Sequence, residues 1–205
     1  MSIDAKIVKA LRDKTGAGMM DCKKALLETD GNIDNAIDHL RKSGIAKAEK
    51  KGERTAKEGL IFSYIHHGGR LGVLVEINCE TDFVAKTEGY SELAHSIAMQ
   101  IAATNPMAIR RENIDQSVVE HEKNIFMDQV KDSGKPENIV EKIVEGRMEK
   151  FYAETCLLEQ SFIKDPDKRV GDLVTQAVAT LGENIVVNRF IRFAIGEDSS
   201  NGQPH

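Results

Sequence analysis

The spacing of apolar residues changes period three times along the chain, and these changes most constrain the fold. Before residue 58, apolar residues recur every three or four positions, as they do on one face of a helix. Residues 60–67 and 71–79 alternate instead, which is the period of a strand. One face of the second run carries Leu71, Val73, Val75, Ile77 and Cys79. Helical spacing then returns, and a third alternating run follows at 185–195. We therefore predict an α+β fold in which helices pack on a small antiparallel sheet.

The first 44 residues are predicted to form a compact three-helix domain. The first helix covers residues 3–14, with Ser2 as its cap, and the second covers residues 19–28. The third begins near Ile33 and is predicted to end at Gly44, because glycine commonly closes a helix. A unit this small has a thin core and would be only marginally stable alone.

The remainder is predicted to comprise a charged linker, a core domain and a tail. The linker covers residues 45–58 and is expected to be partly helical and solvated, because it has few large apolar residues. The α+β core covers residues 59–197, and its first two strands form a hairpin around Gly68 and Gly69. The polar tail, residues 198–205, is expected to be flexible. Within the core, helices are predicted at 88–104, 115–132, from Pro136 and at 170–181, and a short strand is predicted at 156–163.

The charge distribution argues against general nucleic-acid binding. The net charge is -5, and residues 59–205 hold 15 Lys and Arg against 23 Asp and Glu. Phosphate contacts need clustered cations, which this part of the chain lacks. No apolar run approaches the ~20 residues that span a bilayer, so we expect no membrane contact. The three cysteines, Cys22, Cys79 and Cys156, form no CxxC pair, and we expect reduced, buried thiols in a cytoplasmic protein.

No motif in the sequence predicts a catalytic, metal or cofactor site. The glycines Gly16 and Gly18 follow no strand, so a phosphate loop is disfavoured and a turn between helices is the better interpretation. His66 and His67 are adjacent in a strand, where their side chains point to opposite faces and cannot readily hold one metal ion. Glutamates near Cys156 in the sequence would raise its pKa, which disfavours a nucleophile. These absences favour a binding protein over an enzyme.

Two features are unusual for a purely structural chain. Adjacent Met19 and Met20 either both enter the thin core, or one of them reaches the surface, where a methionine suits partner contacts. The segment Thr81-Asp82-Phe83-Val84 lies between a strand and a helix, so it is predicted to be a loop or a short helical turn capped by Thr81 or Asp82. Spacing alone is equally compatible with Phe83 as a core plug and as an exposed anchor.

Several long segments of the chain resemble the elongation factor Ts family, the exchange factors of elongation factor Tu. The first, residues 11–44, reads LRDKTGAGMMDCKKALLETDGNIDNAIDHLRKSG. The other matching segments are KAEKKGERTAKEG (47–59), NCETDFVAK (78–86), SGKPENIVEKIVEGRMEKF (133–151) and NRFIRFAIGE (188–197). Together they cover nearly the whole chain.

The resemblance implies a function in translation elongation. It implies that residues 1–44 form a ubiquitin-associated-like domain that packs on the nucleotide-binding domain of elongation factor Tu. The implied contact face carries Leu11, Thr15, Met19, Met20 and Lys23. The segment Thr81, Asp82, Phe83 and Val84 would enter the GTPase near its Mg²⁺, with Phe83 in an apolar pocket and Asp82 on the neighbouring helices. Loss of Mg²⁺ would then release GDP. The family acts by binding, with no catalytic site or cofactor of its own.

Two departures from the longer family members bear on assembly. Those members carry two related core subdomains and a coiled-coil insertion, whereas this chain is predicted to have one core and no coiled coil. Short members of this kind are expected to form homodimers, here through the core domain. In a smaller departure, Gln160-Ser161-Phe162 stands where the family more often has Gln-Pro-Phe.

Other functions remain compatible with the sequence. The first alternative is a ubiquitin-associated-like adaptor or co-chaperone that uses residues 1–44 on other partners. A helix-turn-helix nucleic-acid binder would need more cations than Lys23 and Lys24 on its second helix. An enzyme with an unrecognised site is the last alternative.

Overall fold

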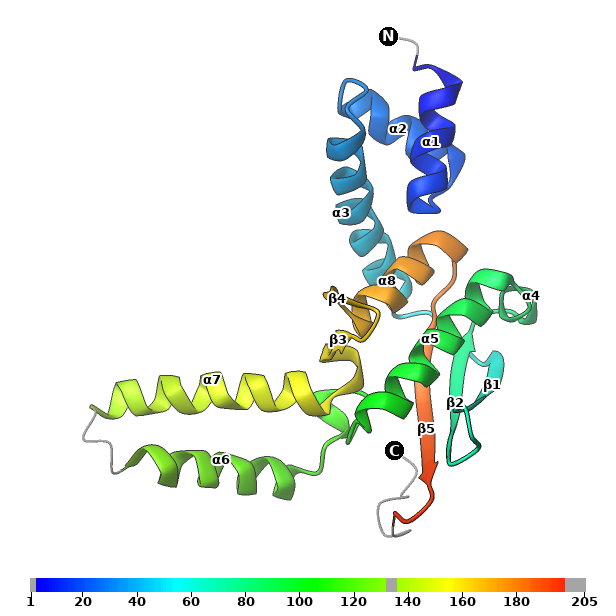
Figure 1. Cartoon of the computed structure of the whole chain (residues 1–205). Helices are drawn as coiled ribbons and strands as arrows, with labels where there is room; N and C mark the ends of the chain where they lie inside the picture. Colours follow the sequence, from blue (N-terminus) through cyan, green and yellow to red (C-terminus); the bar gives the residue numbers. More distant parts are fainter. Residues whose placement is uncertain (1–2, 132–135, 198–205) are drawn as a thin grey trace. The chain divides into compact units, whose positions relative to one another are not determined.

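The computed structural model describes residues 3–131 and 136–197 (Figure 1). The chain falls into two compact units, each built from three separate stretches. The first unit contains 1–60, 77–93 and 173–186, and the second contains 61–76, 94–172 and 187–205. The predicted cap Ser2 and the predicted flexible tail lie outside the described residues.

The three predicted N-terminal helices are present in the first unit. They are α1 (Ala5–Thr15), α2 (Met19–Glu28) and α3 (Ile33–Lys51). The side chain of Asp4 caps α1 by accepting a hydrogen bond from the amide of Lys6. The common core of the three helices consists of Val8, Leu11, Cys22, Ala25, Leu26 and Ala36.

The predicted end of the third helix at Gly44 is wrong. Helix α3 continues to Lys51, through the first half of the segment predicted as a linker. Alanine, lysine and glutamate dominate this half, and all three favour helix. Gly44 serves helix packing instead, because a Cβ atom there would lie 3.3 Å from the Cβ of Ala179 in α8 (Val170–Leu181). The missing side chain lets α3 and α8 approach closely.

The predicted hairpin and third strand are confirmed. Strands β1 (Glu58–Ile65), β2 (Leu71–Cys79) and β5 (Val186–Ala194) form one sheet in the order β1-β2-β5. Just before β5 the Asn184 amide donates to the Glu80 side chain, and just after β5 the Ile195 amide donates to the Arg70 carbonyl, so β5 runs antiparallel to β2. The predicted inner face of β2 is buried at Val73, Val75, Ile77 and Cys79.

The helices of the second half also match the predictions, with one strand pair added. They are α5 (Glu88–Thr104), α6 (Gln116–Lys131), α7 (Glu137–Thr155) and α8. The short strand predicted at 156–163 is present only at the end of that range. A 3-10 turn, η2 (Leu157–Glu159), comes first, and β3 (Ser161–Phe162) then pairs with β4 (Asp165–Arg169). Strand β4 reads DPDKR and has no apolar alternation that could have predicted it.

Helices α6 and α7 pack against each other as an antiparallel pair (Figure 1). The sequence predicts two helices here without a coiled-coil insertion, and it does not predict that they pair. Few side chains of the pair are buried, namely Val130, Val144 and Met148. So few core positions do not make a recognisable heptad pattern in the sequence.

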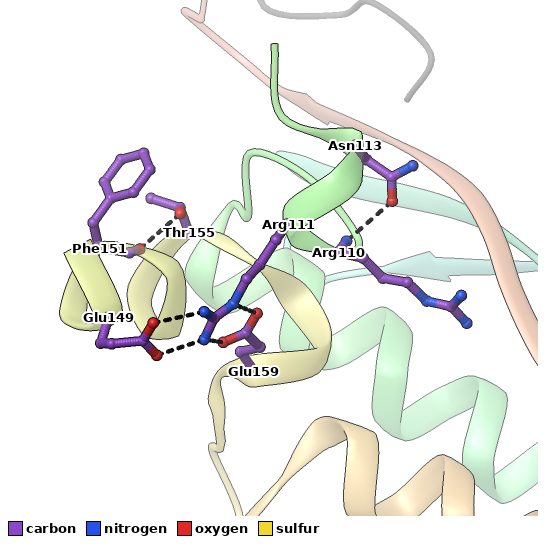
Figure 2. Close-up of polar contacts among 7 residues, drawn as sticks. All are labelled: Arg110, Arg111, Asn113, Glu149, Phe151, Thr155 and Glu159. Carbon is purple, nitrogen blue, oxygen red and sulfur yellow. Dashed lines mark hydrogen bonds and ion pairs between the residues drawn. The ribbon is translucent and has the colours of Figure 1, made fainter. Parts of the chain in front are cut away.

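An arginine that precedes α6 in the chain is bonded to α7 and to the turn after it (Figure 2). Arg111, in the 3-10 turn η1 (Arg111–Asn113), donates to both oxygens of Glu149, at 2.7 Å each, and to both oxygens of Glu159, at 2.5 Å each. Its guanidinium also lies 4.5 Å from the centre of the Tyr152 ring. The hydrogen bonds from Arg111 lower the pKa of Glu149. Two bidentate pairs on one guanidinium fix the orientation of η1 on α7 and η2.

Gly59 is predicted to be the glycine of the sheet least tolerant of substitution. Its φ is +136°, and an added Cβ atom would lie 2.1 Å from the carbonyl oxygen of Ile77 on the paired strand. Gly59→Ala should therefore lower the free energy of unfolding by more than about 2 kcal/mol. The measurement is thermal or urea unfolding followed by circular dichroism.

Gly146 supplies the matched control. It lies inside α7, and a Cβ atom added to it would meet no other atom within 4 Å. Gly146→Ala should raise stability by about 0.5–1 kcal/mol, because alanine favours helix over glycine. Equal effects of the two substitutions would contradict the assignment of a close strand approach at Gly59.

Candidate functional site

The segment Thr81-Asp82-Phe83-Val84 forms a short helical turn at the end of β2. The turn is helix α4 (Asp82–Ala85), and Thr81 precedes it with extended backbone angles of φ −132° and ψ 153°. The predicted helical turn is therefore confirmed. Thr81 occupies the cap position, but its side chain makes no capping hydrogen bond. Its hydroxyl donates to Glu183 instead.

A carboxylate from a distant part of the chain holds the start of this turn. Glu183 accepts hydrogen bonds from the Thr81 amide at 2.9 Å and from the Glu80 amide at 3.1 Å, both on one oxygen. Its other oxygen accepts the Thr81 hydroxyl at 2.6 Å. Three donors on one ionised carboxylate make a strong, oriented contact. The turn is thus fastened to the segment that connects α8 to β5.

A second set of bonds runs in the opposite direction. Glu80 accepts a hydrogen bond from the amide of Asn184 at 2.7 Å and lies 3.6 Å from the guanidinium of Arg54. The buried Asn184 side chain donates to the carbonyl of Arg54 at 2.7 Å. The end of α3, the start of the turn and the start of β5 therefore share one network. Sequence reasoning missed Glu183 and Asn184, because no local pattern marks residues that act about a hundred positions away.

Buried groups beneath the turn complete its support. The hydroxyl of Tyr90, a fully buried residue, donates to the Ile77 carbonyl at 2.6 Å. The Cys79 thiol donates to the Thr81 carbonyl at 3.0 Å, and burial raises the pKa of this thiol. Ala85 closes the turn with its side chain in the core. The turn therefore has a fixed, apolar base.

Phe83 points away from that base. Its side chain is 77% exposed, which is the highest value among the exposed large apolar side chains in the described part of the chain. The core-plug alternative is therefore wrong, and the exposed position is the one present. Beside it, Lys86 pairs with Asp82 at 2.6 Å, and its ammonium lies 6.0 Å from the centre of the Phe83 ring. The hydrogen bond from Lys86 lowers the pKa of Asp82, which keeps this exposed carboxylate ionised.

The predicted N-terminal contact face divides into surface and core. Met19 is 46% exposed, Met20 is 74% exposed, and Lys23 is also exposed. Both methionines therefore reach the surface. Leu11 is fully buried and faces the core of the three helices, so its side chain does not reach the surface of this face. Thr15 is half-buried, and its hydroxyl bonds the Leu11 carbonyl at 2.8 Å.

One further apolar residue extends this face. Leu27 is 45% exposed and follows Met20 and Lys23 on α2 at helical spacing. Its spacing is visible in the sequence, but nothing there separates an exposed leucine from a core one. We call Met19, Met20, Lys23 and Leu27 the α2 face.

The described residues offer no group of three or more His, Cys, Asp or Glu side chains that could hold a metal ion. Within the same residues, His66 bonds the Tyr64 hydroxyl at 2.9 Å, and all three cysteines are buried without a disulfide. No described helix combines the length and the apolar character that crossing a membrane requires.

The exposure of Phe83 leads to a prediction about stability. Phe83→Ala should change the free energy of unfolding by no more than about 0.5 kcal/mol, because the ring makes little core contact. Tyr90→Ala is the contrasting variant and should cost about 3–5 kcal/mol, because it empties a fully buried site. Unfolding in urea measures both. A large loss for Phe83→Ala would restore the core-plug alternative.

Comparisons with known proteins place the chain in a family. Residues 5–197 match the family model described as Elongation factor TS. A protein named elongation factor Ts from Syntrophomonas wolfei is 58% identical over 195 residues, which cover 95% of this chain and 91% of that protein. A namesake from Geotalea daltonii is 57% identical, covering 96% and 91% respectively. Another from Thermosipho melanesiensis is 56% identical, covering 95% and 100%. The chain belongs to the elongation factor Ts family.

Proposed function

We propose that this chain is the guanine-nucleotide exchange factor of translation elongation. It binds elongation factor Tu in its GDP form, displaces Mg²⁺ and promotes release of GDP, so that GTP can bind. It acts by protein binding rather than as an enzyme, in the cytoplasm, without direct contact to nucleic acid or membrane. The observation that carries the proposal is Phe83, exposed on a turn whose base is fastened in a chain of this family.

The energetics of exchange require differential binding. A GTPase holds GDP through its phosphate loop and Mg²⁺. A factor releases GDP only if it binds the nucleotide-free state better than the GDP state. In this proposal Phe83 enters an apolar pocket that opens near the Mg²⁺ site, and its burial supplies about 1.5–3 kcal/mol. Asp82 contacts the helices that shape the magnesium region, while Val84 completes the inserted turn.

The α2 face supplies the second contact in this proposal. Residues 1–44 act as a ubiquitin-associated-like domain that lies on the nucleotide-binding domain of the GTPase. Met19 and Met20 offer adaptable apolar surface there, and Lys23 offers a cation. Thr15 borders the face, whereas Leu11 supports it from inside. This contact holds the GTPase while the Phe83 turn inserts.

A nucleotide-exchange assay tests whether the α2 face provides docking and the Phe83 turn provides GDP release. Release of a fluorescent GDP analogue from elongation factor Tu is followed with increasing amounts of the chain. Phe83→Ala should lower the maximal release rate about tenfold or more, because it removes an apolar contact made only on insertion. Met20→Ala should mainly raise the half-saturating concentration. Met127→Ala, at an exposed methionine of α6, is the control and should leave both unchanged. Failure of the unaltered chain to accelerate release would refute the proposal.

We further propose that the chain forms a homodimer through its core, residues 59–197. One face of the sheet carries exposed apolar side chains within a single compact unit, namely Ile61, Ile65, Leu74, Phe193 and Ile195. Four of these side chains, Ile65, Leu74, Phe193 and Ile195, line one open surface pocket. Exposed apolar side chains grouped in this way are unusual on a monomer and favour association. A second copy of the chain offers the same patch, so a two-fold contact would cover both.

The oligomeric state tests the dimer. Phe193→Asp should shift the chain from dimer to monomer in light scattering coupled to size-exclusion chromatography, because it would bury an unpaired charge at the interface. Met127→Asp is the matched control outside the sheet and should leave the mass unchanged. A monomeric unaltered chain, or a dimer that survives Phe193→Asp, would contradict this interface.

A further inference from the structure

Helix α4 is too short to be stable without contacts from the rest of the chain. It has four residues, and the first turn of a helix costs more conformational freedom than its hydrogen bonds return. The side chain at its cap position forms no capping bond. The turn that presents Phe83 must therefore be held from outside.

Glu183 is the group that holds it. Gly182, with φ +84°, ends α8 and reverses the chain so that Glu183 faces the start of the turn. The Glu183 carboxylate then takes three donors, the amides of Glu80 and Thr81 and the hydroxyl of Thr81, at 2.6–3.1 Å. These two amides lead directly into α4.

A further hydrogen bond joins the same two segments in the opposite direction. The amide of Asn184 donates to Glu80 at 2.7 Å, so residues 80–81 and 183–184 each bind the other. Asn184 is also bonded to the carbonyl of Arg54. A shift of the turn relative to β5 would break several hydrogen bonds at once. The direction in which Phe83 points is thereby set before any partner arrives.

We infer that Glu183 is a positioning residue for nucleotide exchange, acting through the turn that carries Phe83. The inference rests on the proposed function and deepens it. Preorganisation lowers the cost of ordering a loop on binding. If the α2 face provides docking and the turn acts afterwards, loss of Glu183 lowers the maximal release rate more than it raises the half-saturating concentration.

Two substitutions at Glu183 separate positioning from charge. Glu183→Ala removes all three hydrogen bonds. In Glu183→Gln, the amide oxygen accepts from the two backbone amides, and the amide nitrogen donates to the Thr81 hydroxyl, which can also accept. Glu183→Ala should lower the maximal release rate about tenfold, whereas Glu183→Gln should stay within about threefold of the unaltered chain. Glu145→Ala, at an exposed glutamate of α7, is the matched control and should have no effect.

A double-substitution cycle shows whether Glu183 acts through Phe83. In a Phe83→Ala background, Glu183→Ala should have little further effect on release, because the side chain being positioned is already gone. A general loss of fold would lower release by the same factor in both backgrounds. Equal factors would overturn the inference, as would full exchange activity in Glu183→Ala.

Amide hydrogen exchange on the isolated chain gives a readout that does not depend on the GTPase. Glu183→Ala should speed exchange of the amides of residues 80–85 about tenfold or more, while amides of the central part of β2 stay protected. Unchanged protection at 80–85 would overturn the inference. If the unaltered chain fails to release GDP but Glu183→Ala loosens only this turn, the proposed function fails, whereas the positioning of the turn by Glu183 stands.

Discussion

The contact between residues 80–81 and residues 183–184 is the constraint on which the rest of the candidate site depends. One carboxylate takes two amides and a hydroxyl, and a neighbouring amide returns a bond to Glu80. A helix of four residues is too short to be stable alone, so this contact adds to the support that the buried Cys79 and Ala85 give the turn. With it, a side chain as apolar as Phe83 is held in solvent on a defined base. The hydrogen bonds of residues 80–81 and 183–184 therefore hold the exposed Phe83 ring in one orientation.

Exposure of apolar side chains separates the proposed contact residues of this chain from the buried residues beneath them. Phe83, Met20 and Phe193 all lie in solvent, at 77%, 74% and 62% exposure. Each stands on a different element, and each has buried neighbours that hold the element in place. Leu11 is the contrasting case, because it belongs to a matching segment yet lies in the core. Membership of a family motif therefore does not by itself make a residue exposed.

Most of the fold could be predicted from periodicity, and the errors have identifiable causes. The hairpin, the third strand and the long helices have strong period-two or helical patterns, which is why they are predicted correctly. The prediction of a helix end at Gly44 fails, because a glycine that permits close packing on Ala179 looks the same in sequence as a closing glycine. Strand β4 is polar throughout and carries no periodic signal. The pairing of α6 with α7 depends on a handful of buried side chains.

Periodicity and motif are local properties of the chain, so the class of fold, the family and the segment at residues 81–84 could all be predicted from the amino-acid sequence. The sequence was equally compatible with Phe83 in the core and at the surface, and it did not show whether Met19 and Met20 were both buried. These points needed the folded chain, because burial depends on what packs against a residue from elsewhere in the chain. The same holds for Glu183, whose bonds to residues 80 and 81 join segments about a hundred positions apart. Its role follows from a geometry that no local pattern encodes.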